Sequence, residues 1–357
     1  MKILHVVDKL NIGGAEKVIA DLMNMQYIEG MNVDLLVLLD AGPLAKTLNP
    51  KIKIFEMHRE SKFSLDTMKK MELIMTTYDI VHIHMRHVFR YVMVAKMIYP
   101  FNSKIIFHDH SSNFKIDWKN RLHKYFSKKV DQYILTSQEQ SVWVDKFIGL
   151  NKNKMVLMEN VILKKYNNCF MNTGINELRI ILVSNFRRVK NIEFSIRLIR
   201  RLIQAYPNMR FDIYGVAVDK KYFHEICELK KKLDLDQYID IITNQSDIQS
   251  VLCKYDLALH CSKHETGPLV LTEYLAYGLP FIAYRTGSVV ERVFFYDKEM
   301  VIDNFEMERW VAKITNIYEK YNYKSERKKL IDFYKDVYSP KEYIKKCKKI
   351  YQTVLDS

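Results

Sequence analysis

Two glutamates near one helical segment, Glu265 and Glu273, are the residues of this chain best placed by type and spacing to bind a ligand. Seven residues separate them, and the segment runs apolar through its middle before Gly278 and Pro280 end it. This pattern predicts a capped helix of two to three turns. Amide N–H groups at the start of a helix lack intrahelical partners and lie at the positive end of its dipole, so they suit a phosphate.

Glu273 should lie within ~10 Å of that helix start, given the rise of a helix per residue. A carboxylate there can accept hydrogen bonds from two neighbouring hydroxyls. A ligand with a phosphate at one end and hydroxyls at the other would meet both features, and sugar nucleotides have this shape. Either glutamate alone would be ordinary, Glu265 as a first-turn acid and Glu273 as an exposed helix residue. The pair within one Gly/Pro-framed segment favours a binding site.

The segment also resembles a known family. It looks like the nucleotide-sugar signature of the family 4 retaining glycosyltransferases, and further motifs follow that family's order along nearly the whole chain. These motifs are Gly13-Gly14-Ala15-Glu16, Asp79-Ile80-Val81-His82-Ile83-His84, His108-Asp109-His110-Ser111, Glu159-Asn160-Val161, Ser184-Asn185-Phe186-Arg187-Arg188-Val189-Lys190-Asn191, the run from Glu265 to Pro280, and Thr286-Gly287-Ser288. Each motif alone is weak evidence, so the resemblance rests on the ordered set.

The resemblance implies the GT-B fold, in which two Rossmann-like doubly wound α/β domains face each other across a cleft and the last helix crosses back to the N-terminal domain. It also implies donor contacts. Glu265 would bind sugar hydroxyls, Glu273 the ribose, and the amides of Gly267, Leu269 and Val270 the sugar or phosphate. The family retains anomeric configuration, which implies front-face departure in which the leaving phosphate takes the proton of the acceptor hydroxyl.

Glycosyl transfer from a nucleotide donor leaves a diphosphate, so the site must stabilise developing negative charge. The sequence has no convincing Asp-x-Asp motif for a divalent metal, and we expect neither a metal nor a cofactor. Arg187 and Lys190 are the cations expected beside the diphosphate instead. The common family pattern has Gly-Arg two residues earlier, where this chain has Ser184-Asn185. The alternative is that Arg187 and Lys190 belong to a solvated loop.

In the N-terminal half, Gly13 and Gly14 would allow a ligand to approach the backbone closely. By the resemblance this loop lies near the donor phosphate and the acceptor. His110 matches the family position beside the reacting sugar, and His108 is the weaker choice. His82 and His84 alternate along an expected buried strand and are interpreted as structural. We therefore assign catalytic roles to His110, Glu265, Arg187 and Lys190.

The elements that must position these residues alternate between strands and helices. Buried strands are expected at 2–7, 33–39, 80–83, 105–107 and 132–135, with a helix after the Gly-Gly turn, and this order is typical of a parallel sheet. The alternation restarts after a polar stretch at 164–176. We expect an N-terminal acceptor-binding domain over 1–165 with a crossover helix in 340–357, and a C-terminal nucleotide-sugar-binding domain over 176–339. Ligands of such sheets sit beyond the carboxyl ends of the strands, where these loops lie.

Composition limits the class of protein. The chain has 357 residues, of which 48% are hydrophobic and 27% charged, which suits two folded domains. No apolar run approaches the ~20 residues of a membrane span, and residues 1–8 are too quickly polar for a signal peptide. We expect a cytoplasmic protein, with possible peripheral association at the inner face of the plasma membrane.

The net charge of +14 indicates an anionic partner. The sequence contains no nucleic-acid-binding motif, so nucleic acid is not expected. Basic and aromatic residues gather at 115–129, where Trp118, Leu122, Tyr125 and Phe126 share a face at helical spacing. That segment could lie on anionic lipid, or its aromatic face could pack on its own domain.

These expectations favour a retaining, metal-independent hexosyltransferase. It would move a hexosyl-type group from a UDP- or GDP-linked sugar to a glycan or lipid-linked acceptor in the synthesis of a capsule, O-antigen or other surface polysaccharide. Two alternatives remain open: a sugar-nucleotide epimerase or phosphorylase on the same scaffold, and a non-catalytic sugar-nucleotide-binding partner of a transferase. The Glu265/Glu273 segment argues against the epimerase, whereas Asn185 in place of arginine makes the binding partner conceivable.

Overall fold

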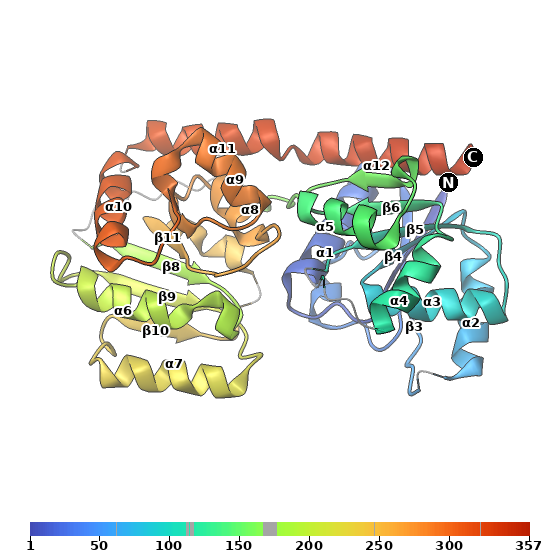
Figure 1. The fold of residues 1–357 in the computed structure, drawn as a ribbon, viewed down its shortest axis with the longest axis horizontal. Coiled ribbons are helices and arrows are strands. Elements are labelled where there is room, and N and C mark those ends of the chain that lie inside the picture. The colour runs from blue at the N-terminus through green and yellow to red at the C-terminus, as the bar shows by residue number, and fades with distance from the viewer. Residues whose placement is uncertain (62, 112–113, 115–117, 167–176, 246, 322) are drawn as a thin grey trace. The chain divides into compact units, whose positions relative to one another are not determined.

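A computed structural model describes residues 1–61, 63–111, 114, 118–166, 177–245, 247–321 and 323–357 (Figure 1). The chain forms two compact units. Unit 1 comprises Met1–Leu163 together with Pro340–Ser357, and unit 2 comprises Lys164–Ser339. Most of the polar stretch expected to connect the domains, and residues 115–117 of the basic aromatic segment, lie outside the described residues.

Unit 1 is built on a parallel sheet with the strand order β3-β2-β1-β4-β5-β6-β7. Its strands are β1 (Lys2–Val7), β2 (Asn32–Val37), β3 (Ile54–Glu56), β4 (Ile80–His84), β5 (Lys104–Asp109), β6 (Gln132–Leu135) and β7 (Met155–Leu157). The central strands are buried on both faces because helices cover both sides of the sheet. The strand order reverses direction between β1 and β4, and such a switch point is where ligands bind in this architecture.

Helices and short helical turns connect the strands of unit 1. They are α1 (Gly14–Ile28), η1 (Pro43–Thr47), α2 (Leu65–Met75), α3 (Arg86–Ile98), α4 (Trp118–Ser127), α5 (Gln138–Trp143), η2 (Val144–Ile148) and η3 (Lys152–Lys154). The C-terminal helix α12 (Pro340–Leu355) returns to this unit, as expected of the crossover helix. Tyr343, Ile344, Cys347 and Tyr351 are among its buried residues.

Unit 2 repeats the architecture with the strand order β10-β9-β8-β11-β12-β13, again all parallel. Its strands are β8 (Arg179–Val183), β9 (Arg210–Tyr214), β10 (Ile239–Ile242), β11 (Leu257–His260), β12 (Phe281–Tyr284) and β13 (Val301–Ile302). The direction of strand order reverses between β8 and β11. Two doubly wound α/β units, as expected from the sequence, are thus confirmed.

The helices of unit 2 are α6 (Ile192–Leu202), α7 (Lys220–Lys232), α8 (Leu269–Ala276), α9 (Ser288–Tyr296), α10 (Met307–Lys320) and α11 (Lys324–Val337). Short turns lie at η4 (Arg188–Lys190), η5 (Ile248–Ser250), η6 (Leu252–Lys254) and η7 (Lys298–Met300). In α6 an apolar stripe is buried while the arginines of the last turn face solvent, where cations also complement the helix dipole. Asp219 immediately precedes α7, and its side chain caps the helix by accepting from the Tyr222 amide.

The expected single aromatic face of the basic segment is wrong in part. In α4 Trp118 is 70% exposed and Tyr125 is 49% exposed, whereas Phe126 is buried in the unit 1 core. Trp118 and Tyr125 are seven residues apart, close to two helical turns, so they share a face, and Phe126 lies one position away on the inner side. The helix therefore packs on its own unit with Phe126 and also exposes two aromatic side chains.

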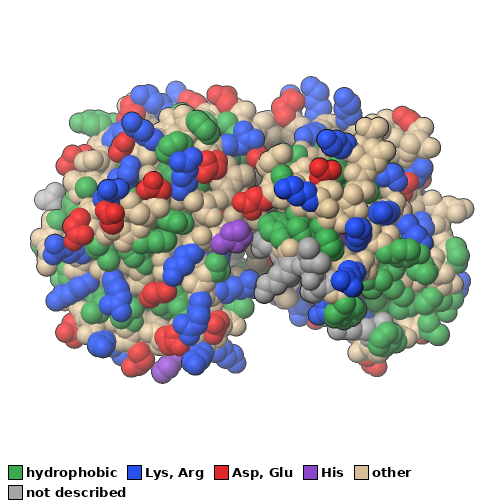
Figure 2. Space-filling view, viewed as in Figure 1, with side chains coloured by type: hydrophobic (Ala, Val, Ile, Leu, Met, Phe, Trp, Pro, Cys, Tyr) green, Lys and Arg blue, Asp and Glu red, His purple; other side chains and the backbone are tan. Residues whose placement is uncertain are grey.

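The exposed surface mixes charges of both signs. In the face of unit 2 shown in Figure 2, lysine and arginine side chains alternate with aspartate and glutamate rather than forming one stripe. Among the described residues, no helix is both long enough and apolar enough to cross a membrane.

Candidate functional site

The switch point of unit 2 brings together three of the side chains that could bind an anionic sugar ligand. Lys190, in the turn after β8, donates from Nζ to Oε1 of Glu265, which lies in the loop after β11. His260, the last residue of β11, places Nε2 3.4 Å from the same Oε1. The backbone joins the two loops as well, because the Lys263 amide donates to the Val189 carbonyl at 2.8 Å. The structure thus unites Lys190 and Glu265, which lie 75 residues apart in sequence.

Glu265 is held in its charged form. Its side chain is only 14% exposed, and this burial acts to raise the pKa of the carboxyl group. Its neighbours His260 and Lys190 outweigh burial and hold the pKa of Glu265 far below its usual range. The site therefore keeps a carboxylate and an ammonium group in contact. The carboxylate can accept hydrogen bonds from hydroxyls of a ligand, and the ammonium can offer charge to an anion.

Glu265 does not lie in the helix that the sequence suggested. Helix α8 begins at Leu269, after Pro268, so Glu265 and Gly267 belong to the loop before it. The amides of Leu269 and Val270 are in the first helical turn, where the helix itself supplies no acceptor. Because Pro268 has no N–H, the donors available at this point are those of its neighbours. The start of α8 therefore offers N–H donors without helical acceptors, and an anion site there stays a prediction.

A second helix begins beside this loop. The Ser288 amide, at the start of α9, donates to the Thr266 carbonyl at 2.8 Å, and the Glu265 amide donates to Thr286 Oγ1 at 3.0 Å. Gly287 has a φ of 84°, and a Cβ there would approach Pro268 Cδ to 3.0 Å and Glu265 Cβ to 3.2 Å. Only glycine accommodates both the left-handed backbone and this contact. The Thr286–Ser288 turn thus fixes the position of Glu265 and sets two helix starts next to each other.

Glu273 lies within α8 and is 4% exposed. Gln249 donates from Nε2 to Glu273 Oε1 at 3.2 Å, and Gln249 in turn accepts from the Tyr277 hydroxyl at 2.8 Å. The carboxylate is thus oriented by neighbours instead of being an exposed helix residue. A carboxylate has acceptor capacity beyond one such hydrogen bond.

Arg187 and its neighbour Arg188 behave differently from Lys190. The side chain of Arg187 is exposed, and it forms no ion pair within the described parts of the chain. Arg188 pairs with Glu225 on the surface of the unit, and its side chain is 58% exposed. Asn185, which stands near the usual arginine position of the family, accepts from the Val216 amide at 3.1 Å through its side chain. Asn185 therefore has a structural role in closing the loop after β8.

In unit 1, Gly13 caps the start of α1 and Gly14 is its first helical residue. A Cβ on Gly13 would collide with the Glu16 carboxylate, whereas a Cβ on Gly14 would meet no atom within 4 Å. The turn after β1 thus leaves open space at Gly14, next to amides at a helix start. Close approach of a ligand to this turn stays a prediction.

His110 follows β5 and joins a group of buried imidazoles at the carboxyl ends of β1, β4 and β5. His110 Nε2 lies 3.1 Å from His84 Nδ1, and His84 Nε2 lies 2.9 Å from His5 Nδ1. Burial lowers the pKa of His110 to about 4 and, against an opposing hydrogen bond from Gln26, that of His5 to about 4. His84, interpreted from sequence as structural, is therefore in direct contact with the residue assigned to the reacting sugar, and these imidazoles are neutral at pH 7.

The residue before His110 anchors this loop. Asp109 is fully buried and accepts from Arg86 Nη2 at 2.7 Å, from the Tyr133 hydroxyl at 2.8 Å and, through its other oxygen, from the Ser111 amide at 3.0 Å. Burial raises the pKa of Asp109, and the charge of Arg86 more than offsets it, so that the pKa lies below its usual value. This ion pair fixes the backbone on both sides of His110.

Two trios of histidines have ring nitrogens close enough to hold a metal ion. Within the described residues these are His5, His82 and His84, and His84, His108 and His110, with all ligand atoms of each trio within 4.8 Å of one another. The sequence predicts no metal site, and two of these short distances are hydrogen bonds between rings.

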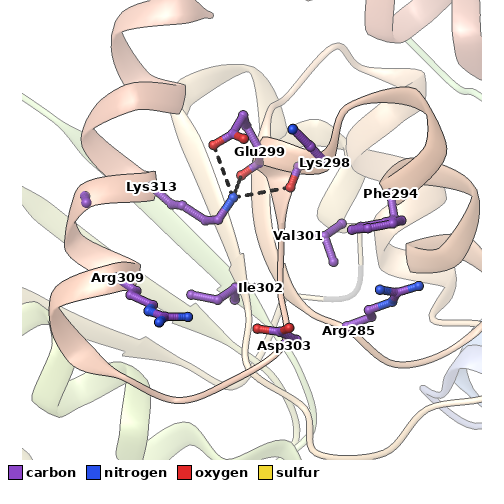
Figure 3. A pocket seen from close by; sticks show the side chains of 10 residues that line it. Arg285, Phe294, Lys298, Glu299, Val301, Ile302, Asp303, Arg309 and Lys313 are labelled. Carbon is purple, nitrogen blue, oxygen red and sulfur yellow. Dashed lines mark hydrogen bonds and ion pairs between the residues drawn. The ribbon is translucent and has the colours of Figure 1, made fainter.

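A cavity of about 410 Å³ lies elsewhere in unit 2, beside β13 (Figure 3). Its lining includes Arg285, Phe294, Asp303 and Lys313, and Lys313 is engaged by Glu299 at 3.2 Å. None of the residues assigned to the site lines this cavity. Because it contains none of these residues, this cavity is not the candidate site.

Several residues that contact the candidate site residues were not predicted from the sequence. His260 and Thr286 hold Glu265, Gln249 orients Glu273, and Gln26 contacts His5. Of these, His260 carried a usable signal, because it ends a buried strand at the edge where ligands bind. The others are polar residues whose partners are far away in sequence.

Two family models match the chain. The model described as "Glycosyltransferase Family 4" matches residues 12–162, and the model described as "Glycosyl transferases group 1" matches residues 172–336. Together they cover most of both units, and each falls within one of them.

Relatives and solved structures agree with these matches. The chain is 25% identical over 233 residues to an uncharacterized 41.2 kDa protein in the cps region of Klebsiella pneumoniae, covering 60% of this chain and 62% of that protein. It is 30% identical over 123 residues to N-acetyl-alpha-D-glucosaminyl L-malate synthase of Bacillus anthracis, covering 33% and 30%. These alignments span less than two thirds of either relative.

The structure of Anabaena HepE in complex with UDP and glucose superposes with a TM-score of 0.80 at 16% identity, covering 98% of each chain. At this identity the likeness shows the fold.

Proposed function

Because the chain is a family 4 glycosyltransferase with the GT-B fold, we propose that it is a retaining hexosyltransferase acting in cell-surface polysaccharide synthesis. It moves a hexosyl group from a nucleoside diphosphate sugar to a glycan or lipid-linked acceptor. The observation that carries this proposal is the contact of Lys190 with Glu265 beside the start of α8. This arrangement combines the cation of Lys190 with the carboxylate of Glu265, which can accept from hydroxyls, and with the amides at the start of α8.

Each part of a nucleotide sugar has a matching group in unit 2. The diphosphate is bound by the ammonium group of Lys190, by the guanidinium group of the exposed Arg187, and by the amides of Gly267, Leu269 and Val270. The hexose hydroxyls donate to Glu265. The ribose hydroxyls donate to Glu273, which Gln249 already holds in position. In this proposal these cations and amides carry the charge of the leaving diphosphate without a metal ion.

The proposed reaction needs no protein nucleophile. The bond between the anomeric carbon and the diphosphate oxygen breaks, and the acceptor oxygen bonds to the same face of that carbon. The proton of the acceptor hydroxyl passes to the departing phosphate oxygen. Gly13, Gly14 and His110 of unit 1 serve the sugar and the acceptor in this proposal, with Gly14 leaving room for the ligand.

The polysaccharide role and the donor base are supported by relatives only. One relative comes from a cps region, and HepE was solved with UDP and glucose. A membrane-bound acceptor is supported by α4, where Trp118 and Tyr125 are exposed beside basic residues. In this proposal α4 rests on anionic lipid at the inner face of the plasma membrane.

The test is a transfer assay with the purified protein. UDP- and GDP-linked hexoses are incubated with and without a bacterial lipid extract, and with and without EDTA. We expect nucleotide release that requires the extract, survives EDTA and is lost in Glu265→Ala. Glu225→Ala is the matched control, since Glu225 also pairs with a cation of the same loop but on the exposed surface.

Two outcomes would contradict the proposal. An altered free sugar nucleotide without transfer would indicate an epimerase. Binding of a sugar nucleotide without turnover under all these conditions would indicate a non-catalytic partner.

A further inference from the structure

Five histidines lie close together at the carboxyl ends of β1, β4 and β5, and nothing in the proposed transfer reaction requires so many. Four of them, His5, His82, His84 and His108, have no exposed surface. The ring centroids of neighbouring members lie 4.2 to 5.5 Å apart. A neutral imidazole has one N–H donor and one acceptor nitrogen, so each hydrogen bond between two rings fixes which nitrogen carries hydrogen.

At one end of this group, His5 is hydrogen-bonded to the side-chain amide of Gln26. The amide oxygen of Gln26 lies 2.8 Å from His5 Nε2, and the amide nitrogen of Gln26 donates to the Tyr351 hydroxyl at 2.7 Å. Because an amide oxygen can only accept, His5 must carry its hydrogen on Nε2. The Tyr351 hydroxyl is 2.7 Å from His82 Nδ1, and its single hydrogen, which the contact with Gln26 does not use, is assigned to that nitrogen.

The tautomers of the next rings follow link by link. His5 has its hydrogen on Nε2, so its Nδ1 accepts, and His84 must donate from Nε2 across the 2.9 Å contact. His84 Nδ1 then accepts, and His110 must donate from Nε2 across 3.1 Å. His110 is left with a bare Nδ1. Within the described residues this atom is buried and has no hydrogen-bond partner.

We propose that Gln26 and Tyr351 are positioning residues that set the tautomer of His110 through His5 and His84, so that His110 Nδ1 is a hydrogen-bond acceptor for a ligand hydroxyl. The role in transfer rests on the proposed function, whereas the tautomer assignment does not. An imidazole with a bare nitrogen can orient a sugar hydroxyl but cannot offer it an N–H. Burial without a partner is costly for a polar atom, and a bound hydroxyl would supply the partner that the protein does not.

The tautomers of the hydrogen-bonded histidines change together. Reversing the Gln26 amide would present its N–H₂ group to His5 and would turn over the tautomer of every ring as far as His110. While its single hydrogen is donated to His82 Nδ1, the Tyr351 hydroxyl can only accept from Gln26, and this keeps the amide nitrogen on its side. Tyr351 belongs to α12, the segment that returns to unit 1 from the end of the chain. Through these hydrogen bonds, Tyr351 of the C-terminal helix influences the tautomer of His110, which lies about 240 residues earlier in the sequence.

The test is ¹⁵N NMR of the full-length protein labelled at histidine, recorded at pH 7 with long-range couplings that distinguish the two tautomers. His5→Gln, His84→Gln and His110→Gln assign the resonances. The wild type should show His5, His84 and His110 all hydrogenated at Nε2. In Tyr351→Phe the amide loses its anchor, and all three rings should shift together towards a mixture of tautomers.

The matched control is Tyr343→Phe. Tyr343 is a buried tyrosine of the same helix whose hydroxyl has no partner among the described residues. Its loss should leave the three tautomers and the transfer rate unchanged. If the two tautomers become equally populated in Tyr351→Phe, kcat/KM for glycosyl transfer falls by about twofold, because only half the molecules present the acceptor nitrogen.

Three results would overturn the proposal. They are hydrogenation at Nδ1 in His110 of the wild type, unchanged tautomers in Tyr351→Phe, and retention of one equivalent of Zn²⁺ on the histidines, because nitrogens bound to metal carry no hydrogen. Zn²⁺ is measured by titration calorimetry with the metal alone and by elemental analysis. Failure of transfer with every donor, with the tautomers as described, would instead refute the proposed function and leave the hydrogen-bond chain standing.

Discussion

Replacing Lys190 by methionine should separate the two roles of this lysine, one in stability and one in transfer. Methionine keeps much of the side-chain length and removes the charge. Glu265 would then retain His260 at 3.4 Å as its basic neighbour. The side chains of Lys190 and Glu265 are 22% and 14% exposed, so their interaction lies between that of a surface pair, below about 1 kcal/mol, and a ceiling of ~4 kcal/mol for a close pair in a protein environment. We expect a loss of about 1–3 kcal/mol in the free energy of unfolding.

The effect on transfer should be larger. Removing one group that stabilises developing charge costs on the order of 2–4 kcal/mol in the transition state. At about 1.4 kcal/mol for each factor of ten, kcat/KM should fall by roughly 30- to 700-fold. The assay follows release of nucleoside diphosphate with donor and lipid extract, alongside urea denaturation of the same preparation.

Arg188→Met is the control for this experiment. Arg188 lies in the same turn and pairs with Glu225, but its side chain is 58% exposed, so we expect both stability and transfer to stay close to wild type. A Lys190→Met enzyme with kcat/KM within about threefold of wild type would refute the assignment of Lys190 to the leaving diphosphate. An equal loss in Arg188→Met would show that the turn as a whole, and not the charge of Lys190, is what matters.

Three further predictions follow from the structure. Gly14→Ala should leave the free energy of unfolding unchanged or raise it by up to about 1 kcal/mol, because alanine favours a helix and its Cβ meets no atom within 4 Å. The transfer assay should nevertheless show weaker activity. Full activity would mean that no ligand approaches this turn. Trp118→Ser should reduce sedimentation with anionic vesicles, whereas Phe295→Ser, which removes an 82% exposed aromatic from unit 2, should not; equal loss in both would contradict a membrane role of α4. The pKa of Glu265 is held below its unfolded value despite burial, so its contribution to stability is present above about pH 4.3 and is lost as the pH falls; thermal melts from pH 7 to pH 3 should fall more steeply for wild type than for Glu265→Gln, and parallel curves would contradict the depressed pKa.

The alternation of buried strands and helices was predictable because it depends on local patterns. The apolar runs ending at Val7, Phe107 and Val183 gave both units and the edge on which their ligands lie. The residue at which α8 starts was harder to predict, because the loop before it is held by contacts with Thr286 and Gly287 from another turn. Such a contact between distant turns leaves no periodicity in the sequence.

The candidate site was predictable residue by residue but not as a set of contacts. Glu265 and Lys190 were recognisable from their motifs, yet the ion pair between them and the approach of His260 depend on how β8 and β11 lie side by side. The histidine chain was hidden for the same reason, since His5 and Gln26 meet only when α1 packs on the sheet. The contacts of buried polar side chains were thus the features that could be predicted least well from the sequence.

The measurement that tests the central claim most directly is the anomeric configuration of the first product. A ¹³C-labelled hexose is supplied as its nucleoside diphosphate derivative with lipid extract, and the new glycosidic carbon is observed by NMR before any further processing. We predict a labelled glycoside with the same anomeric configuration as the donor, formed by wild type and absent with Glu265→Ala. An inverted product, or a donor that remains bound and unchanged, would contradict the proposal that this chain transfers glycosyl groups with retention.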